Sequence, residues 1–322
     1  MSILAAQPAA EAGQGGTAGR PARGRVRDPK VLAGGVILGV FVILAVAGPY
    51  LAPYNPSAAT GANLAAPSAA HWLGTTQTGQ DVFSELLTGA RVTLLVGFAA
   101  GAIATVLAVI VGVTAGFVGG LGDELLSLLS NVFLVIPALP LVIVLAGYLH
   151  NAGALAVAAV ISVTGWAFGA RVLRAQTLSL REREFVVAAR ARGERLWRLV
   201  LFEILPNERA IIVSGFLLTS VFAVLTQASL AFLGVGSISS WSWGTMLYWA
   251  QNAEAFTIGA WWWYVPPGLC IGLFGMALGL LNFAIDEGLN PRLRAVPRGR
   301  KHGPRRPVVR RPVVQRKAGA AR

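Results

Sequence analysis

The chain has 322 residues, of which 55% are hydrophobic and only 13% are charged, and its formal net charge is +13. A soluble domain carries about a quarter charged residues, so this composition excludes an ordinary soluble protein. Long apolar runs alternate with basic blocks, and membrane topology explains such blocks without any nucleic acid. We therefore expect an all-α, polytopic membrane protein, with no nucleic acid among its partners.

The N-terminal part begins with a polar stretch and continues into the first apolar run. Residues 1–30 are rich in Ala, Gly and Arg and have no apolar period, so we expect a disordered cytoplasmic tail. Residues 45–47 resemble a signal-peptidase site, but the run at 31–52 is long for a signal peptide and more spans follow it. The interpretation favoured for 31–88 is a first transmembrane helix followed by an external segment.

The middle of the chain contains five further apolar runs, which we expect to form the core at 89–291. Each is close to the length of about 20 residues that crosses the hydrocarbon core of a bilayer. With the first run they give six transmembrane helices, and 292–322 remains as a basic cytoplasmic tail. The five runs cover roughly 92–116, 125–149, 152–172, 210–235 and 264–285.

The basic residues predict the orientation in the membrane. Of the 27 Lys and Arg residues, 26 lie in 1–30, 171–209 and 292–322, and one orientation places all three blocks in the cytoplasm. Both termini are then cytoplasmic. The last external segment, 236–263, holds six tryptophans, which we interpret as an aromatic belt at the outer interface rather than a ligand cage. They are Trp241, Trp243, Trp249, Trp261, Trp262 and Trp263.

A few polar or helix-breaking residues inside the spans are candidates for a translocation path. The third span carries Asn131, Pro137 and Pro140, and the prolines should kink it. The fifth span carries Gln227 and Ser229. These residues could line a polar path or could simply bond between helices, and the sequence leaves both alternatives open.

The sequence offers no catalytic machinery. A P-loop needs a lysine beside its phosphate-binding glycines, but all three lysines lie in the terminal segments and no G-x-x-x-x-G-K-[ST] occurs. The three histidines are isolated in the sequence and form no metal-ligand set. We expect a protein that is not an enzyme and has no catalytic residue, cofactor or metal.

One charged stretch, EFVVAARARGERLWRLVLFEILPN at 184–207, separates two apolar runs. Its small residues would let a partner protein approach closely, although an ordinary solvated loop is the simpler alternative. Gly193 should interrupt the helix and give two short helices, and Pro206 should end the second one. Ala189 and Gly193 lie four residues apart, so we expect them to share the face that docks against the partner.

This stretch resembles the "EAA" loop found in the membrane subunits of bacterial ABC importers. That motif has two alanines, a glycine four residues later and a Leu-Pro twelve residues after the glycine. Val187 replaces the glutamate of the motif, and Glu184 lies one helical turn earlier. Segments 66–97, 229–236, 242–247 and 285–294 are similar to the C-type permease of dipeptide, oligopeptide and nickel importers. The matching loop residues are Ala188, Ala189, Gly193, Leu205 and Pro206.

The resemblance implies a type I ABC importer permease fold in the bacterial inner membrane. It implies a homologous B-type permease as heterodimer partner, two ATPase subunits or a fused one, and an external substrate-binding protein. It implies that the loop at 184–207 contacts the ATPase and that the translocation path carries short peptides. The alternatives are nickel chelates, a secondary carrier or a membrane scaffold. We expect the basic tail at 292–322 to associate with membrane lipid.

Overall fold

The computed structural model describes residues 29–148 and 153–289, and every regular element in this part of the chain is helical. This confirms the all-α prediction. Predictions for the rest of the two terminal tails lie outside the described residues. The helices are α1 (Pro29–Leu51), α2 (Val82–Val118), α3 (Gly120–Val135), α4 (Ala138–Tyr148), α5 (Ala154–Leu180), α6 (Glu184–Ala191), α7 (Leu196–Leu199), the π-helical turn η2 (Val200–Ile204), α8 (Leu205–Phe232), α9 (Trp243–Asn252) and α10 (Trp261–Leu289).

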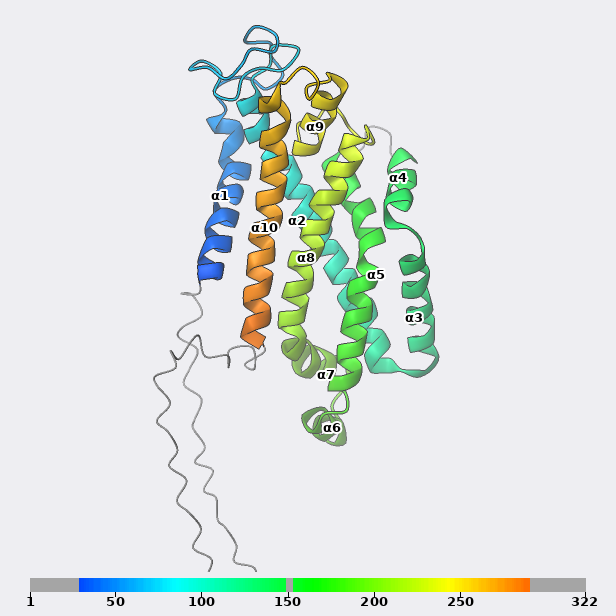
Figure 1. Ribbon diagram of the computed structural model, residues 1–322. Helices are drawn as coiled ribbons and strands as arrows, with labels where there is room; N and C mark the ends of the chain where they lie inside the picture. The colour runs from blue at the N-terminus through cyan, green and yellow to red at the C-terminus, as the bar shows by residue number, and fades with distance from the viewer. Residues whose placement is uncertain (1–28, 149–152, 290–322) are drawn as a thin grey trace, which may run out of the picture.

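The long helices form a bundle (Figure 1) with α1 and α10 at one side and α3 and α4 at the other. The central helix α2 packs against α5, α8 and α1. Glycines permit the closest approach, because a Cβ added at Gly112 would lie 2.3 Å from the carbonyl oxygen of Ala170 on α5. Small residues bring transmembrane helices together in the same way in other membrane proteins.

Five of these helices are long and apolar enough to cross a membrane, and the α3–α4 pair makes six if it counts as one span. The two helices of this pair are bent by 89° at the short break before Ala138. Pro137 lies in that break, where the missing backbone N–H prevents a continuous helix. The prediction that proline distorts the third span is therefore confirmed.

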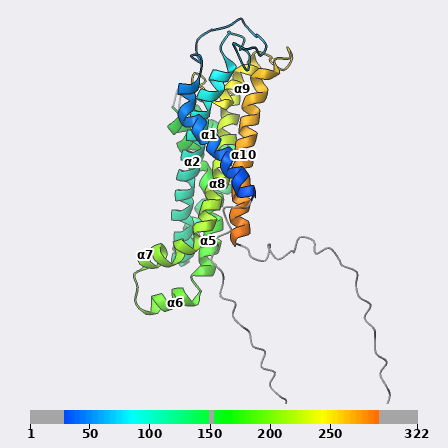
Figure 2. The ribbon, with the colours of Figure 1, turned by 90° about the vertical axis from the view of Figure 1, so that its left-hand side faces the viewer.

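One end of the bundle collects the beginning of α1, the end of α10 and the short helices α6 and α7 (Figures 1 and 2). An ion pair between Lys30 and Glu287 joins the first and last helices there. The segment 53–81 and α9 lie at the opposite end. The two ends therefore separate the segments predicted to be cytoplasmic from those predicted to be external.

At the opposite end, the segment 53–81 folds over the bundle and starts α2. The side chain of Asp81 accepts a 2.8 Å hydrogen bond from the backbone N–H of Ser84 and caps the helix. His71 Nδ1 lies 2.9 Å from Asp81 Oδ1, which fixes the loop against that cap. As a result α2 begins at Val82, ten residues before the predicted apolar run.

The tryptophans at this end do not all form an interfacial belt. Trp243 and Trp263 are only 1% and 2% exposed. The indole of Trp243 donates to the carbonyl of Leu86 at 3.2 Å, and that of Trp262 donates to the carbonyl of Thr75 at 3.3 Å. The belt prediction is wrong for Trp243 and Trp263, because both rings pack inside the buried cluster that also contains Phe41, Met246 and Phe274.

Candidate functional site

The loop predicted to contact an ATPase consists of α6, a turn at Gly193, and α7. Of these elements, α6 lies beyond the ends of the long helices, whereas α7 lies level with them (Figure 2). Gly193 has φ +78°, a left-handed conformation that glycine adopts without steric cost. Its N–H donates to the carbonyl of Arg190 at 3.0 Å, which closes the turn after α6. The predicted interruption at Gly193 is confirmed, and α6 is the short helix before it.

Pro206 does not end the second short helix. Helical backbone continues from Leu196 to Phe232, through the π-helical turn of Val200–Ile204. Pro206 is the second residue of α8, directly after that turn, where the start of a regular helix tolerates a missing N–H. The prediction is wrong because the wider π turn leads the chain into α8 without a break.

Ala189 is buried inside this chain and is not part of a docking face. It is 0% exposed and belongs to the same cluster as Val186, Leu199 and Ile204. The spacing argument assumed that one helix carries both Ala189 and Gly193, but α6 ends at Ala191. Only a small side chain fits at position 189, because α6 packs tightly against α7 there.

The outer side of the loop exposes large apolar side chains. Trp197 is 57% exposed and Phe202 is 63% exposed, although both lie on a polar segment outside the bundle. Soluble surfaces rarely leave a contiguous apolar patch of this kind uncovered. Ala188, Gly193, Glu184 and Pro206 are also exposed, whereas Leu205 is half-buried. The term loop surface is used below for Phe185, Val187, Ala188, Leu196, Trp197 and Phe202.

The inner side of the loop is tied to the helix ends. The guanidinium of Arg181, just after α5, donates to the carbonyl of Gly116 on α2 at 3.2 Å. The guanidinium of Arg190 on α6 lies 5.5 Å from the ring centroid of Phe117. These two contacts join the loop region to the ends of α2 and α5.

The five residues proposed for the path do not come together. Asn131 on α3 and the two prolines near the bend are exposed, and Asn131 lines a small pocket between α2, α3 and α5. Gln227 is buried and its Nε2 donates to Ser242 Oγ at 3.1 Å. The hydroxyl of Ser229 donates to the carbonyl of Leu225 one turn earlier. Gln227 thus forms a hydrogen bond between α8 and the beginning of α9. For this residue the structure favours a bond between helices over a polar path.

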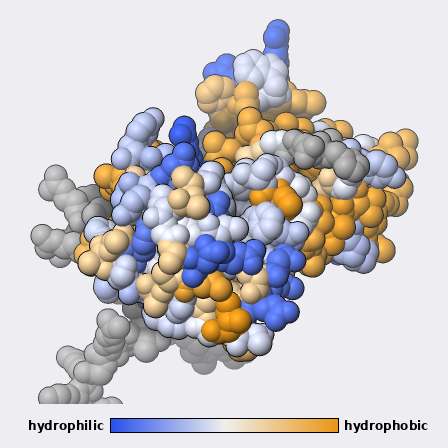
Figure 3. Space-filling view, turned by 90° about the horizontal axis from the view of Figure 1, so that it is seen from above, coloured by the Kyte–Doolittle hydropathy of each residue, from blue (hydrophilic) through white to orange (hydrophobic). Residues whose placement is uncertain are grey.

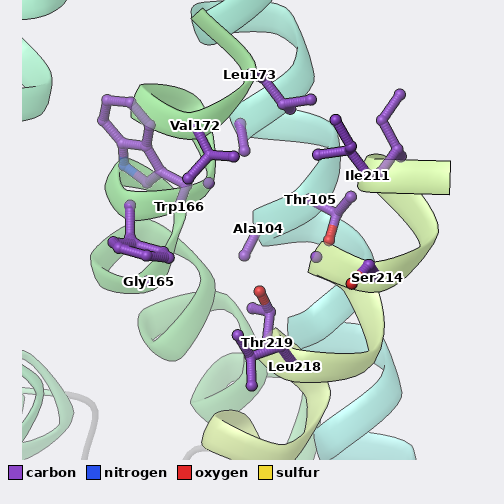
Figure 4. A pocket seen from close by; sticks show the side chains of 15 residues that line it. Ala104, Thr105, Gly165, Trp166, Val172, Leu173, Ile211, Ser214, Leu218 and Thr219 are labelled. Atoms are coloured by element: carbon purple, nitrogen blue, oxygen red, sulfur yellow. The ribbon is translucent and has the colours of Figure 1, made fainter. Parts of the chain in front are cut away.

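A groove of about 160 Å³ instead lies between α2, α5 and α8 (Figure 4). Its walls are mostly apolar, with hydroxyl groups contributed by Thr105, Ser214 and Thr219. The sequence analysis did not identify it. The sequence does contain a pattern that could have identified the groove. Small residues that lie four apart line it, at positions 104 and 108 on α2 and at positions 165 and 169 on α5.

Comparison with known families and proteins agrees with this architecture. Residues 104–295 match the family described as binding-protein-dependent transport system inner membrane component. Residues 26–67 match the N-terminal TM domain of oligopeptide transport permease C.

Similar proteins match along most of their length. The dipeptide transport system permease protein DppC of Bacillus subtilis is 33% identical over 274 residues, 84% of each chain. The oligopeptide transport system permease protein OppC of the same organism is 33% identical over 84% of this chain and 88% of its own. OppC of Mycobacterium tuberculosis is 30% identical over 85% of this chain and 94% of its own. The chain therefore belongs to the binding-protein-dependent transport system inner membrane component family, as a C-type permease subunit of the dipeptide and oligopeptide importer group.

Proposed function

We propose that this chain forms half of the translocation path of an ATP-driven importer of short peptides. Its partners are a homologous B-type permease, two ATPase subunits or a fused one, and an external substrate-binding protein. The similarity to a dipeptide permease and an oligopeptide permease supports the peptide assignment. ATP is hydrolysed by the partner subunits, and this chain converts their movement into opening and closing of the path.

The loop surface carries this proposal. It is apolar and exposed, lies beyond the end of the bundle, and is flanked by charges such as Glu184 and Arg190. A soluble subunit docking there would cover Trp197 and its neighbours, and burial of such aromatic side chains stabilises interfaces. The contacts of Arg181 and Arg190 with the end of α2 provide the mechanical connection from the docked subunit to the bundle.

The orientation follows from the same proposal. An ATPase docks from the cytoplasm, so the loop, the beginning of α1 and the end of α10 lie at the cytoplasmic end. The segment 53–81 and α9 then face the external binding protein. The groove between α2, α5 and α8 is the proposed path-facing surface of this chain, because small side chains and three hydroxyl groups meet there on an otherwise apolar bundle.

Reconstitution tests the function directly. Proteoliposomes containing this chain, its B-type partner and the ATPases should take up a labelled dipeptide when ATP and the binding protein are supplied. Uptake should stop when ATP is replaced by a non-hydrolysable analogue. Uptake that persists without the ATPases would contradict the importer mechanism. Uptake of a nickel chelate without competition from peptides would contradict the peptide assignment.

A further inference from the structure

A second pocket lies at the end of the bundle opposite the loop surface. It has a volume of about 250 Å³ and is bordered by Glu85 near the start of α2 and by the rings of Trp241, Trp249 and Trp263. Other lining residues are Gln77, Thr78 and Gln80. Figure 3 views this end from above and shows hydrophilic side chains gathered over the centre of the face. Under the proposed orientation the pocket opens to the side on which substrate arrives.

Glu85 is a buried acid with an unsatisfied carboxylate. Its side chain is 1% exposed, and neither oxygen has a hydrogen-bond partner among the described residues. The nearby carboxylate of Asp81 is already occupied, with one oxygen facing His71 and the other accepting from Ser84. Burial disfavours the ionised form of Glu85, and a cation that entered the pocket would compensate for the charge of that form.

The aromatic walls of the pocket favour a cation. Trp241 donates its indole N–H to Ser57 Oγ at 3.1 Å, and Trp249 donates to the carbonyl of Ile238 at 3.3 Å, which hold both rings in place. Trp263 differs, because its Nε1 is buried and has no acceptor in the described part of the chain. Indole rings attract ammonium groups through their negative faces. The pocket therefore favours a ligand that carries a positively charged hydrogen-bond donor for Glu85 and an acceptor for the N–H of Trp263.

A bound metal ion fits these residues poorly. Calcium takes six to eight oxygen ligands, and the described residues contain no group of three His, Cys, Asp or Glu side chains that could hold a metal. A primary ammonium fits better, because its three N–H donors match the two free oxygens of Glu85. In the amino terminus of a peptide, a carbonyl oxygen follows the ammonium within the same residue and can accept from Trp263.

We propose that this external pocket binds the α-ammonium group of a short peptide, with Glu85 as counter-ion and Trp263 Nε1 as donor to the first carbonyl oxygen. The choice of a peptide rests on the proposed function. Phosphatidylethanolamine presents the same chemistry, a primary ammonium near acceptor oxygens, and is the other source that the experiment must separate.

The test is a binding titration without ATP. The complex is placed in nanodiscs of phosphatidylglycerol, which has no primary ammonium, and titrated calorimetrically with Ala-Ala and with N-acetyl-Ala-Ala. We expect saturable binding of Ala-Ala and binding about tenfold or more weaker for the acetylated peptide, since a hydrogen-bonded charge is lost. Glu85→Gln should weaken Ala-Ala binding to a similar degree. Glu254→Gln, an exposed carboxylate at the same end and outside the pocket, should leave the affinity unchanged.

A second variant guards against misfolding of Glu85→Gln. Trp263→Phe keeps an aromatic wall but removes the donor, so it should weaken Ala-Ala binding more than binding of ethylammonium, which has no carbonyl. Equal binding of the free and acetylated peptides, or wild-type affinity in Glu85→Gln, would overturn the proposal. Peptide binding that vanishes when phosphatidylethanolamine is added would assign the pocket to that lipid.

The outcome is separable from that of the transport assay. Normal ATP-dependent peptide uptake with unchanged Ala-Ala affinity in Glu85→Gln would overturn the pocket assignment and leave the importer function standing. Glu85-dependent binding of Ala-Ala without any peptide uptake would overturn the proposed function and leave the ammonium site standing.

Discussion

The hydroxyl of Thr177 donates a 2.7 Å hydrogen bond to Oε1 of Glu208, and both side chains are fully buried. This bond joins the last turn of α5 to the first turn of α8, the two helices between which the loop at 184–207 is inserted. The second oxygen of Glu208 has no partner in the described part of the chain. Within the described residues, the hydroxyl of Thr177 is therefore the hydrogen-bond donor that compensates for burial of the Glu208 carboxyl group.

Removing that donor should destabilise the protein. Thr177→Val keeps the shape of the side chain but leaves Glu208 without its hydrogen bond, which should cost about 1–3 kcal/mol of unfolding free energy. Thr177→Ser retains a hydroxyl and should cost less. Thermal unfolding of the purified protein measures both, and equal Tm values for the two variants would show that the hydrogen bond is not the cause.

The two neighbouring alanines of the loop should respond differently to a large charged side chain. Ala188 is exposed on the loop surface, so Ala188→Arg should leave the membrane level and Tm of this chain near wild type while weakening copurification of the ATPases and substrate-stimulated ATP hydrolysis. Ala188→Ser, a small replacement at the same position, is the matched control and should retain both. Undiminished copurification in Ala188→Arg would exclude the loop surface as the docking site.

Ala189→Arg should instead damage the loop itself. Ala189 is packed among Val186, Leu199 and Ile204, so an arginine there forces these side chains apart and buries a charge. We expect a lower membrane level or a protease-sensitive loop even when no ATPase is expressed. A normal level and resistant loop in the absence of the ATPases would mean that this site accommodates a long side chain.

The membrane orientation is tested by labelling. In a background with Cys270→Ser, single cysteines replace Ala69 in the segment 53–81 and Ser179 near the end of α5, both exposed positions. An impermeant thiol reagent added to intact cells should label the first and not the second. Labelling of Ser179 without permeabilisation would reverse the proposed orientation and place the coupling loop outside.

Much of the fold could be predicted because length and hydropathy decide which segments can cross a bilayer. Within the described residues each of the six apolar runs overlaps a long helix or, for the third run, the bent pair α3–α4, and Pro137 lies at the expected break in that third run. The start of α2 could not be found in this way. Glu85 and Arg91 lower the local hydropathy, and the helix begins there because Asp81 caps it and the 53–81 segment buries its first turn.

The candidate site was predicted less completely. The loop and its glycine hinge were located from residue types, since only glycine adopts the conformation of Gly193 without cost. The burial of Ala189 depends on how α6 folds back on α7, which is a tertiary contact without a helical period. The acid at Glu85 was overlooked because its environment is made by residues far away in sequence, among them Trp249 and Trp263.

The close packing of α2 on α5 leads to a final prediction, for Gly112. A Cβ there would meet the carbonyl oxygen of Ala170 at 2.3 Å, a backbone atom that cannot move without shifting α5. Gly112→Ala should therefore destabilise the bundle by about 1–3 kcal/mol, the usual range for overpacking. Gly165→Ala is the matched control, because an added Cβ on this glycine of α5 meets nothing within 4 Å. In a helix the replacement of glycine by alanine is intrinsically stabilising by about 1 kcal/mol, so the control should hold or raise the Tm while Gly112→Ala lowers it. A Tm that rises in both variants would show that α2 and α5 can separate at little cost, and the transmission of loop movement through these two helices would have to be reconsidered.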